Sequence, residues 1–140
     1  MDHIAIMDPR RGLISKILSG HKTVESRWYQ TRRAPWDKIR AGETVYFKDS
    51  GKPVTAKAKV AKVLQFELKD LADARVVAKK YGKAIMLANS DPAKWGRLPR
   101  YCILVFLSHP TPIIPFAIDK TGFGAGAAWI TISKVSGIKK

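Results

Sequence analysis

The sequence has only one cysteine and no long apolar run. Cys102 has no partner for an internal disulfide, which fits a reducing compartment, and its place in the apolar stretch 101–107 predicts a buried side chain. No run reaches the roughly 18 apolar residues of a membrane span, and the N-terminus lacks the apolar stretch of a signal peptide. These absences predict a soluble, cytoplasmic protein with no membrane partner.

Acidic residues are also scarce. The chain has 11 aspartates and glutamates against 26 lysines and arginines, which gives a formal net charge of +15. A compact chain of this charge repels itself and attracts polyanions. RNA or a nucleotide is therefore the expected partner, although lysines that are merely solvated would produce the same balance.

The residue types that bind metals or form catalytic triads show no characteristic spacing in this sequence. The three histidines are scattered, the aspartates have no ligand spacing, and nothing marks a Ser-His-Asp triad. Ser50-Gly51-Lys52 lacks the rest of a phosphate-binding loop, which excludes a nucleoside triphosphatase of that class. The sequence thus predicts no metal site and no cofactor.

The residues that are present suffice for one domain spanning positions 1–140, because 46% of them are hydrophobic. Apolar patterning predicts strands at 3–7, 23–28, 44–48, 54–66, 101–107, 113–116 and 129–132. Helices are predicted at 9–19 and 68–81, with a helical turn at 36–40 and a short helix within 89–95. Non-consecutive strands with inserted helices indicate an α+β fold, closest to a small barrel.

Several local signals refine these elements. Gly20 and Gly82 are expected to end the two helices. Small apolar residues alternate along strand 54–66 until Lys62 breaks the phase, which predicts either a bulge near Val60-Ala61 or an exit from the core. Prolines are expected to interrupt the strand after residue 107, and the basic tail 134–140 is expected to be frayed.

The stretch from Gly20 to Arg27 concentrates charge. Glu25 and Arg27 share one face of the predicted strand, whereas Lys22 lies on the other unless a turn redirects it. Lys22 could bind phosphate or, if desolvated, act as a base. Arg27 could bind phosphate through its planar fork. Glu25 could pair with either cation or accept a proton, and neighbouring Thr23 could add a hydroxyl.

Aromatic residues are interleaved with cations elsewhere, a pattern typical of surfaces that stack bases and hold phosphates. Further candidates for binding RNA are Trp28, Arg32, Arg33, Tyr46, Lys48 and Lys52. Trp28 and Trp36 could instead plug one end of a barrel. Trp129, between two apolar neighbours, is predicted to lie in the core.

The spacing Gly20-x-Lys22-x-x-Glu25-x-Arg27 resembles the G-x-K-x-x-E-x-R signature of the ASCH domain, a branch of the PUA-like superfamily. A helix precedes the motif, as in that family, and the sequence from Ile39 to Phe47 resembles the strand that follows it there. The resemblance is good over the first half of the chain and looser over the second. It implies a β-barrel of about five or six strands with helices at its openings.

The resemblance also implies a function. ASCH domains are regarded mainly as RNA-binding modules, so it implies a basic cleft that holds RNA or a nucleotide, into which a turn after Gly20 brings Lys22. Some members are enzymes, which makes a hydrolase the alternative: a ribonuclease, or an amidohydrolase acting on acetylated cytidine. Lys22 and Glu25 would then be catalytic, with Thr23 as a further candidate.

The amidohydrolase group uses a lysine, a threonine and a glutamate, and this chain departs from that set. Lys22 falls on the lysine, but Glu25 stands at the threonine position. Glu67 matches the distant glutamate by order alone. A basic protein that binds a partner and retains only a vestigial cleft is a third possibility, which predicts that substitutions in the motif have no effect.

Overall fold

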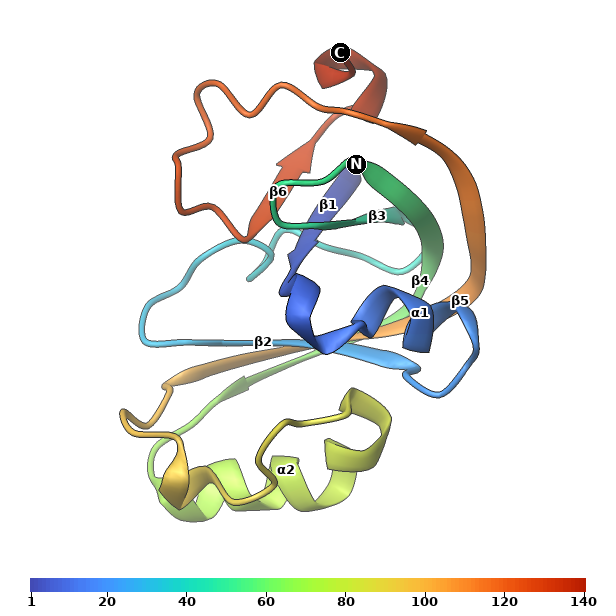
Figure 1. Ribbon diagram of the computed structural model, residues 1–140. Helices are drawn as coiled ribbons and strands as arrows, with labels where there is room; N and C mark the ends of the chain where they lie inside the picture. The colour runs from blue at the N-terminus through green and yellow to red at the C-terminus, as the bar shows by residue number, and fades with distance from the viewer.

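Six strands form one strongly curved, mixed sheet in the computed structural model, which describes residues 1–140 (Figure 1). The strands are β1 (Asp2–Met7), β2 (Val24–Tyr29), β3 (Thr44–Asp49), β4 (Val54–Glu67), β5 (Tyr101–Phe116) and β6 (Trp129–Ile132). Their order is β2-β5-β4-β3-β1-β6, with β1 and β3 parallel and all other neighbours antiparallel. The sheet curls into a half-barrel, so the predicted small α+β barrel is confirmed.

Two helices cover different sides of the curved sheet (Figure 1). Helix α1 (Leu13–Leu18) packs its apolar residues on the inner core, whereas α2 (Leu71–Ile85) lies below the sheet against the outer side of β5 and β2. Three short 3-10 helices complete the chain: η1 (Pro9–Arg11), η2 (Pro92–Lys94) and η3 (Val135–Ile138). Neither α-helix has the length and apolar content needed to cross a membrane.

The long pair β4–β5 curves the sheet. Every second residue from Val54 to Val60 is buried, as the alternation predicted. The register with β5 then shifts between Val60 and Lys62, so the bulge predicted near Val60-Ala61 is confirmed. A bulge increases local twist and bends the strand, which helps to close the half-barrel around Phe47, a fully buried residue of the inner core.

The predicted interruption of the strand after residue 107 is wrong. Strand β5 continues to Phe116 through three prolines, and the predicted strand 113–116 is its end. A proline cannot donate to a ladder, but β5 pairs with β2 only as far as Phe106, and the last bond on that side runs from the Leu107 amide to the Thr23 carbonyl, so one edge is free over the part that holds the prolines. His109, with a φ of 53°, and register shifts against β4 accommodate the remaining irregularity.

The helix predictions need correction at three places. Gly12, with a φ of 61°, divides the predicted helix 9–19 into η1 and α1. Helix α2 begins after its N-cap Asp70, runs through Gly82, and ends where Met86 turns left-handed. The predicted helical turn at 36–40 is absent, because Asp37 has a φ of 55°, which no right-handed helix tolerates.

The C-terminal tail is not frayed, contrary to the prediction. Residues 135–138 form η3, and Val135 is buried with Ile118 against the outer face of the sheet. Backbone bonds from Asp119 to Ile138 and from Lys140 to Ala117 fix the segment. Cys102 and Trp129 are buried as predicted, and burial raises the pKa of the Cys102 thiol.

A buried histidine joins β1, β6 and Glu43, the residue before β3. Trp129 Nε1 donates to His3 Nδ1 over 3.1 Å, so Nε2 carries the proton and donates to Glu43 Oε1 over 2.9 Å. Because His3 is fully buried, desolvation lowers its pKa below the ordinary value of 6.5, although Glu43 opposes that shift. The neutral ring therefore belongs to the folded state.

This histidine should make folding stability depend on pH. As pH falls below about 6.5, the unfolded chain takes up a proton that the folded chain refuses, so the free energy of unfolding should decline by up to about 1.4 kcal/mol per pH unit. Urea denaturation on both sides of this pH measures the decline. In His3→Gln it should be smaller, whereas exposed His21→Gln should retain it. Equal slopes in all three proteins would contradict the prediction.

Candidate functional site

The motif begins in the turn that follows α1. Gly20 has a φ of 83°, so it ends the helix as predicted. The Lys22 amide donates to Lys16, and the Thr23 amide donates to Ala84 at the end of α2. Held between both helices, the turn brings the Lys22 side chain to the same side as Glu25, which strand alternation alone does not.

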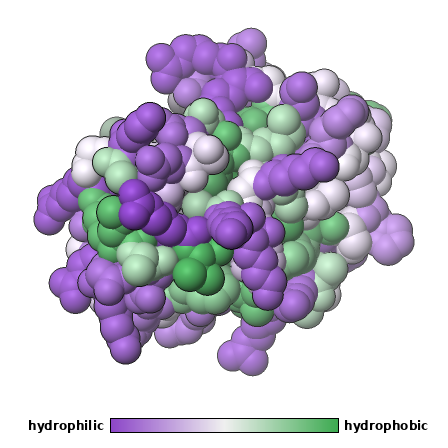
Figure 2. Space-filling view, turned by 90° about the horizontal axis from the view of Figure 1, so that it is seen from below, coloured by the Kyte–Doolittle hydropathy of each residue, from purple (hydrophilic) through white to green (hydrophobic).

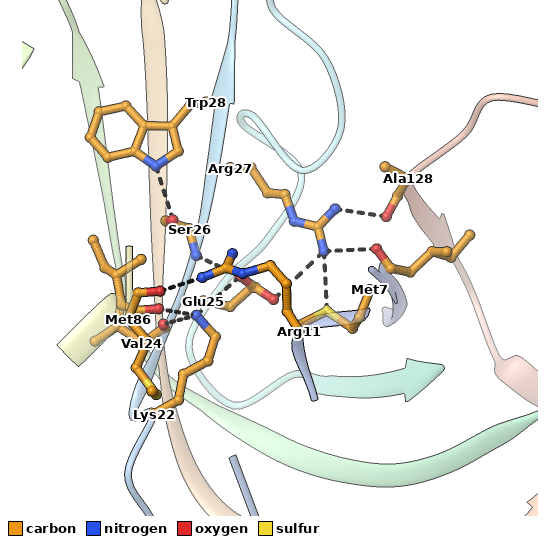
Figure 3. Close-up of polar contacts among 12 residues, drawn as sticks. Met7, Arg11, Lys22, Val24, Glu25, Ser26, Arg27, Trp28, Met86 and Ala128 are labelled. Carbon is orange, nitrogen blue, oxygen red and sulfur yellow. Dashed lines mark hydrogen bonds and ion pairs between the residues drawn. The ribbon is translucent and has the colours of Figure 1, made fainter. Parts of the chain in front are cut away.

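Three charged side chains meet beside β2, the strand at one edge of the sheet (Figure 3). Lys22 Nζ lies 3.5 Å from Glu25 Oε1, and Arg27 Nη2 lies 3.6 Å from Glu25 Oε2. Their side chains are 2%, 6% and 12% exposed, respectively. The motif thus forms a buried cation–anion–cation cluster, and we call these three residues the motif triad.

Two backbone carbonyls hold the ammonium group of Lys22. Its ammonium donates to the carbonyl of Val24 over 2.9 Å and to the carbonyl of Ile85. Burial lowers its pKa, while the charge of Glu25 acts in the opposite direction. With its donors directed at two carbonyls and one carboxylate, Lys22 is placed to position Glu25.

Arg27 connects three parts of the chain. Nη1 donates to the Ala128 carbonyl over 3.0 Å, and Nη2 donates to the Ile6 carbonyl over 3.3 Å. The guanidinium also lies over the ring of Trp129, 5.1 Å from its centroid. One planar group thereby links β2, the end of β1 and the glycine-rich loop at 122–128 (Figure 3).

Glu25 has an unsatisfied oxygen. Oε1 accepts from the Ser26 amide over 2.9 Å, but Oε2 is buried and accepts no hydrogen bond. Buried polar atoms in folded proteins nearly always have a partner, and an ionised carboxylate can only accept. Oε2 is therefore the atom of this cluster that lacks a hydrogen-bond donor.

A cleft of about 260 Å³ runs between η1 and β2. Glu25 and Arg27 line it from the strand, and Arg11 and Leu13 line it from the opposite side. Arg11 is exposed and donates from Nη2 to the Met86 carbonyl over 2.6 Å. Asp8, which is paired with Arg10, also lines the cleft. The cleft thus has two carboxylates and two guanidinium groups, and of the guanidinium groups only that of Arg11 lies at its exposed rim.

A second pocket, of about 350 Å³, adjoins the cleft at Tyr29, which lines both. Its other walls are Arg33, Trp129 and the loop that carries Phe123. The Arg33 guanidinium lies over the Tyr29 ring, 5.2 Å from the centroid. Aromatic walls beside one cation suit a flat ring that bears a negative group nearby.

The structure separates the other predicted residues on and near β2 from the motif triad. Trp28 packs edge-on against Trp95, 4.8 Å between centroids, and its Nε1 donates to Ser26 Oγ. Arg32 is exposed and pairs with Glu67 over 2.6 Å. Thr23 is exposed at the start of β2. None of these three predicted side chains lines the second pocket, and of them only Trp28 borders the cleft.

The candidates from β3 lie elsewhere. Tyr46 packs against Phe116, 6.0 Å between ring centroids, in the outer cluster formed with the C-terminal segment. Lys48 is buried, which lowers its pKa, and Lys52 is exposed in the following loop. None of the three lines the cleft or the second pocket.

Sequence reasoning missed Arg11, Tyr29 and Phe123. Tyr29 could have been found, because it shares the strand face of Glu25 and Arg27 by alternation. Arg11 and Phe123 come from a short 3-10 turn and a distant loop, and no sequence spacing links either of them to the motif. No three His, Cys, Asp or Glu side chains are grouped so as to hold a metal ion.

Comparison with protein-family models and with curated proteins gives no match. Solved structures do match. The ASCH protein of Zymomonas mobilis has a TM-score of 0.70 and 17% identity, covering 99% of this chain and 96% of that one. A serine-to-alanine mutant of it has the same TM-score, 19% identity, and coverages of 97% and 91%. Hypothetical protein PH0355 has a TM-score of 0.51 and 14% identity, covering 81% of this chain and all 100% of that one. The chain therefore has the fold of ASCH-domain proteins, as the motif implied.

Proposed function

We propose that this ASCH-fold chain binds RNA as an unpaired strand in the cleft between η1 and β2. The lining of the cleft carries the proposal, because Glu25 meets the guanidinium groups of Arg11 and Arg27 there, and a carboxylate accepts hydrogen bonds from a ligand that donates them. The cations around it require the same ligand to be anionic. A ribonucleotide combines the two requirements, since its hydroxyl and amino groups donate and its phosphate is negative.

The phosphate of one nucleotide would lie in the cleft and its base in the second pocket. Arg11 at the exposed rim offers guanidinium donors to a phosphate, which it can hold in a bidentate manner. The second pocket offers Tyr29 and Phe123 to a base. One stacked base contributes about 1–3 kcal/mol to binding of a single strand. Because Tyr29 borders both spaces, a base and its phosphate can occupy them together.

The charge of the whole chain supports the same ligand. Only five of the 26 lysine and arginine side chains are paired with a carboxylate: Arg10, Lys22, Arg27, Arg32 and Arg75. The remaining positive charge is not neutralised within the fold, so it attracts a polyanion over distances of about a Debye length.

Arg11→Gln tests the phosphate contact. Because the slope of log affinity against log salt reflects about 0.7 per phosphate on a single strand, it should decrease by about that amount. Fluorescence anisotropy with labelled oligouridylate at several salt concentrations measures it. Arg97→Gln is the matched control, since Arg97 is exposed and lines neither the cleft nor the second pocket.

Two outcomes would contradict this assignment. The first is an Arg11→Gln slope equal to that of Arg97→Gln. The second is binding of wild-type protein that does not respond to salt. Oligodeoxyuridylate addresses Glu25 separately: if its carboxylate accepts from a ribose 2′-hydroxyl, the RNA should bind more tightly than the DNA.

Hydrolysis is the second candidate function, and one observation favours it. Glu25 lines the cleft, and the buried ammonium of Lys22 lies 3.5 Å from its Oε1, an arrangement that suits a general base held by Lys22. Acetylated cytidine as the substrate has less support, because Glu67 is 60% exposed and paired with Arg32, outside the cleft. Labelled RNA and acetylated cytidine, each incubated with wild type and with Lys22→Met/Glu25→Gln, test both chemistries. Equal turnover by both proteins would exclude hydrolysis at this cleft.

A further inference from the structure

A second basic groove lies outside the cleft, along α2. It has a volume of about 540 Å³ and separates the helix from the loop that leads into η2. Arg75, Lys79 and Lys83 line it from the helix, and Ser90 and Asp91 line it from the loop. Figure 2 looks onto this side of the molecule, where hydrophilic side chains surround a smaller apolar area.

The three cations form a column on one side of the helix. They are spaced by four residues, so they lie one above another over about 12 Å. All three are exposed, while Val77 and Ala78 between them face the core. The column is therefore a surface feature that the packing of α2 does not require.

The column is also unfavourable for the helix alone. Like charges four residues apart repel one another, and the pairs 75/79 and 79/83 are both of this kind. Asp91, 3.6 Å from Arg75, compensates the charge of that arginine. Lys79 and Lys83 take part in none of the ion pairs of the structure. A bound polyanion would remove the repulsion that the fold leaves uncompensated.

The groove and the cleft share no lining residue, but the C-terminal end of α2 connects them. The carbonyls of Ile85 and Met86, two and three residues beyond Lys83, accept hydrogen bonds from Lys22 and Arg11. The same helix end thus meets both the motif triad and the rim arginine of the cleft.

We propose that the α2 groove binds the phosphodiester backbone of a nucleic acid strand, with Lys79 and Lys83 as its phosphate contacts. The chemistry favours a backbone over an acidic polypeptide, because the regular spacing of about 6 Å along the helix suits repeated charges. The lining also offers only Ala78 and Pro92 as apolar contacts for side chains. The groove does not require that the cleft bind RNA, so the two sites can be tested apart.

The first test removes the two contacts. In Lys79→Gln/Lys83→Gln, the salt slope for an oligouridylate long enough to span both sites should decrease by about 1.4, since each phosphate contributes about 0.7. The matched control is Lys57→Gln/Lys134→Gln, which removes the same charge from exposed positions outside the groove. Equal slopes in the two variants would overturn the proposal.

The second test separates binding from folding. Lys79→Glu converts two repulsive pairs into attractive ones, so its Tm at low salt should rise by about 2–4 °C while its affinity for the oligouridylate falls roughly tenfold. A lower affinity in a more stable protein cannot result from misfolding. Unchanged affinity of this variant would overturn the proposal.

The third test identifies the ligand by NMR. Backbone amides at 79–83 and at Ser90 should shift on addition of oligouridylate, in wild type and also in Arg11→Gln, where the cleft is weakened. Shifts confined to residues of the cleft would overturn the site. Equally large shifts at 79–83 with polyglutamate would show recognition of negative charge in general and would overturn the assignment to nucleic acid.

Discussion

Replacing Lys22 by methionine is expected to lower the free energy of unfolding by about 3–5 kcal/mol, because it removes one partner of a buried ion pair. Glu25 would keep its charge with only Arg27 beside it, and the carbonyls of Val24 and Ile85 would lose their donor. Urea denaturation at neutral pH measures the loss. Few single substitutions outside the apolar core should cost as much.

Two further variants make this result interpretable. Lys16→Met alters an exposed lysine of α1 and should change stability by no more than about 0.5 kcal/mol. Lys22→Met/Glu25→Gln removes the charge of both partners and should recover at least about 1 kcal/mol, since neighbouring substitutions couple. A Lys22→Met protein as stable as Lys16→Met would contradict the view that Lys22 supports the motif triad.

Replacing Arg27 by lysine is expected to weaken RNA binding roughly tenfold and to lower stability by about 2–4 kcal/mol, although the charge is retained. A lysine ammonium is compact and not planar, so it cannot reach the Ala128 and Ile6 carbonyls from the two ends of a fork and lie flat over Trp129 at once. The loop at 122–128 would lose its link to β2. Its amides should then exchange with solvent faster, which hydrogen exchange measures directly.

Arg33→Lys is the matched control for this substitution. Arg33 is exposed and lies over Tyr29 without a carboxylate partner, so its replacement should leave the exchange of the loop unchanged. If Arg27→Lys and Arg33→Lys give the same exchange rates, the contacts of Arg27 do not stabilise the glycine-rich loop. The position of Phe123 in the second pocket would then need another explanation.

The elements that could be predicted from sequence are those set by local pattern. The alternation of apolar and polar residues predicted β4, because burial of one strand face requires an apolar residue at every second position. Lys62 breaks this alternation, which predicted the bulge. The spacing of the motif identified the three charged residues that the structure brings together. These signals lie within a few residues of one another.

What could not be predicted depends on contacts between distant segments. Strand β5 tolerates its prolines because its pairing with β2 stops at Phe106. This limit is set by the arrangement of the strands in the sheet and not by local propensity. Gly82 remains helical because α2 packs on the sheet as far as Ile85. The carbonyl partner of Lys22 at Ile85 lies 63 residues away, so no spacing rule could have indicated it.

Strand β2 lies at an open edge of the half-barrel, and its exposed backbone has a consequence for self-association. Odd residues of the strand bond to β5, which leaves the groups of Val24 and Ser26 on the free side. The Val24 carbonyl accepts from Lys22, and the Ser26 amide donates to Glu25. Another chain that paired with this edge would have to displace both bonds and bury two charges. The same residues that form the candidate site therefore protect the edge against aggregation.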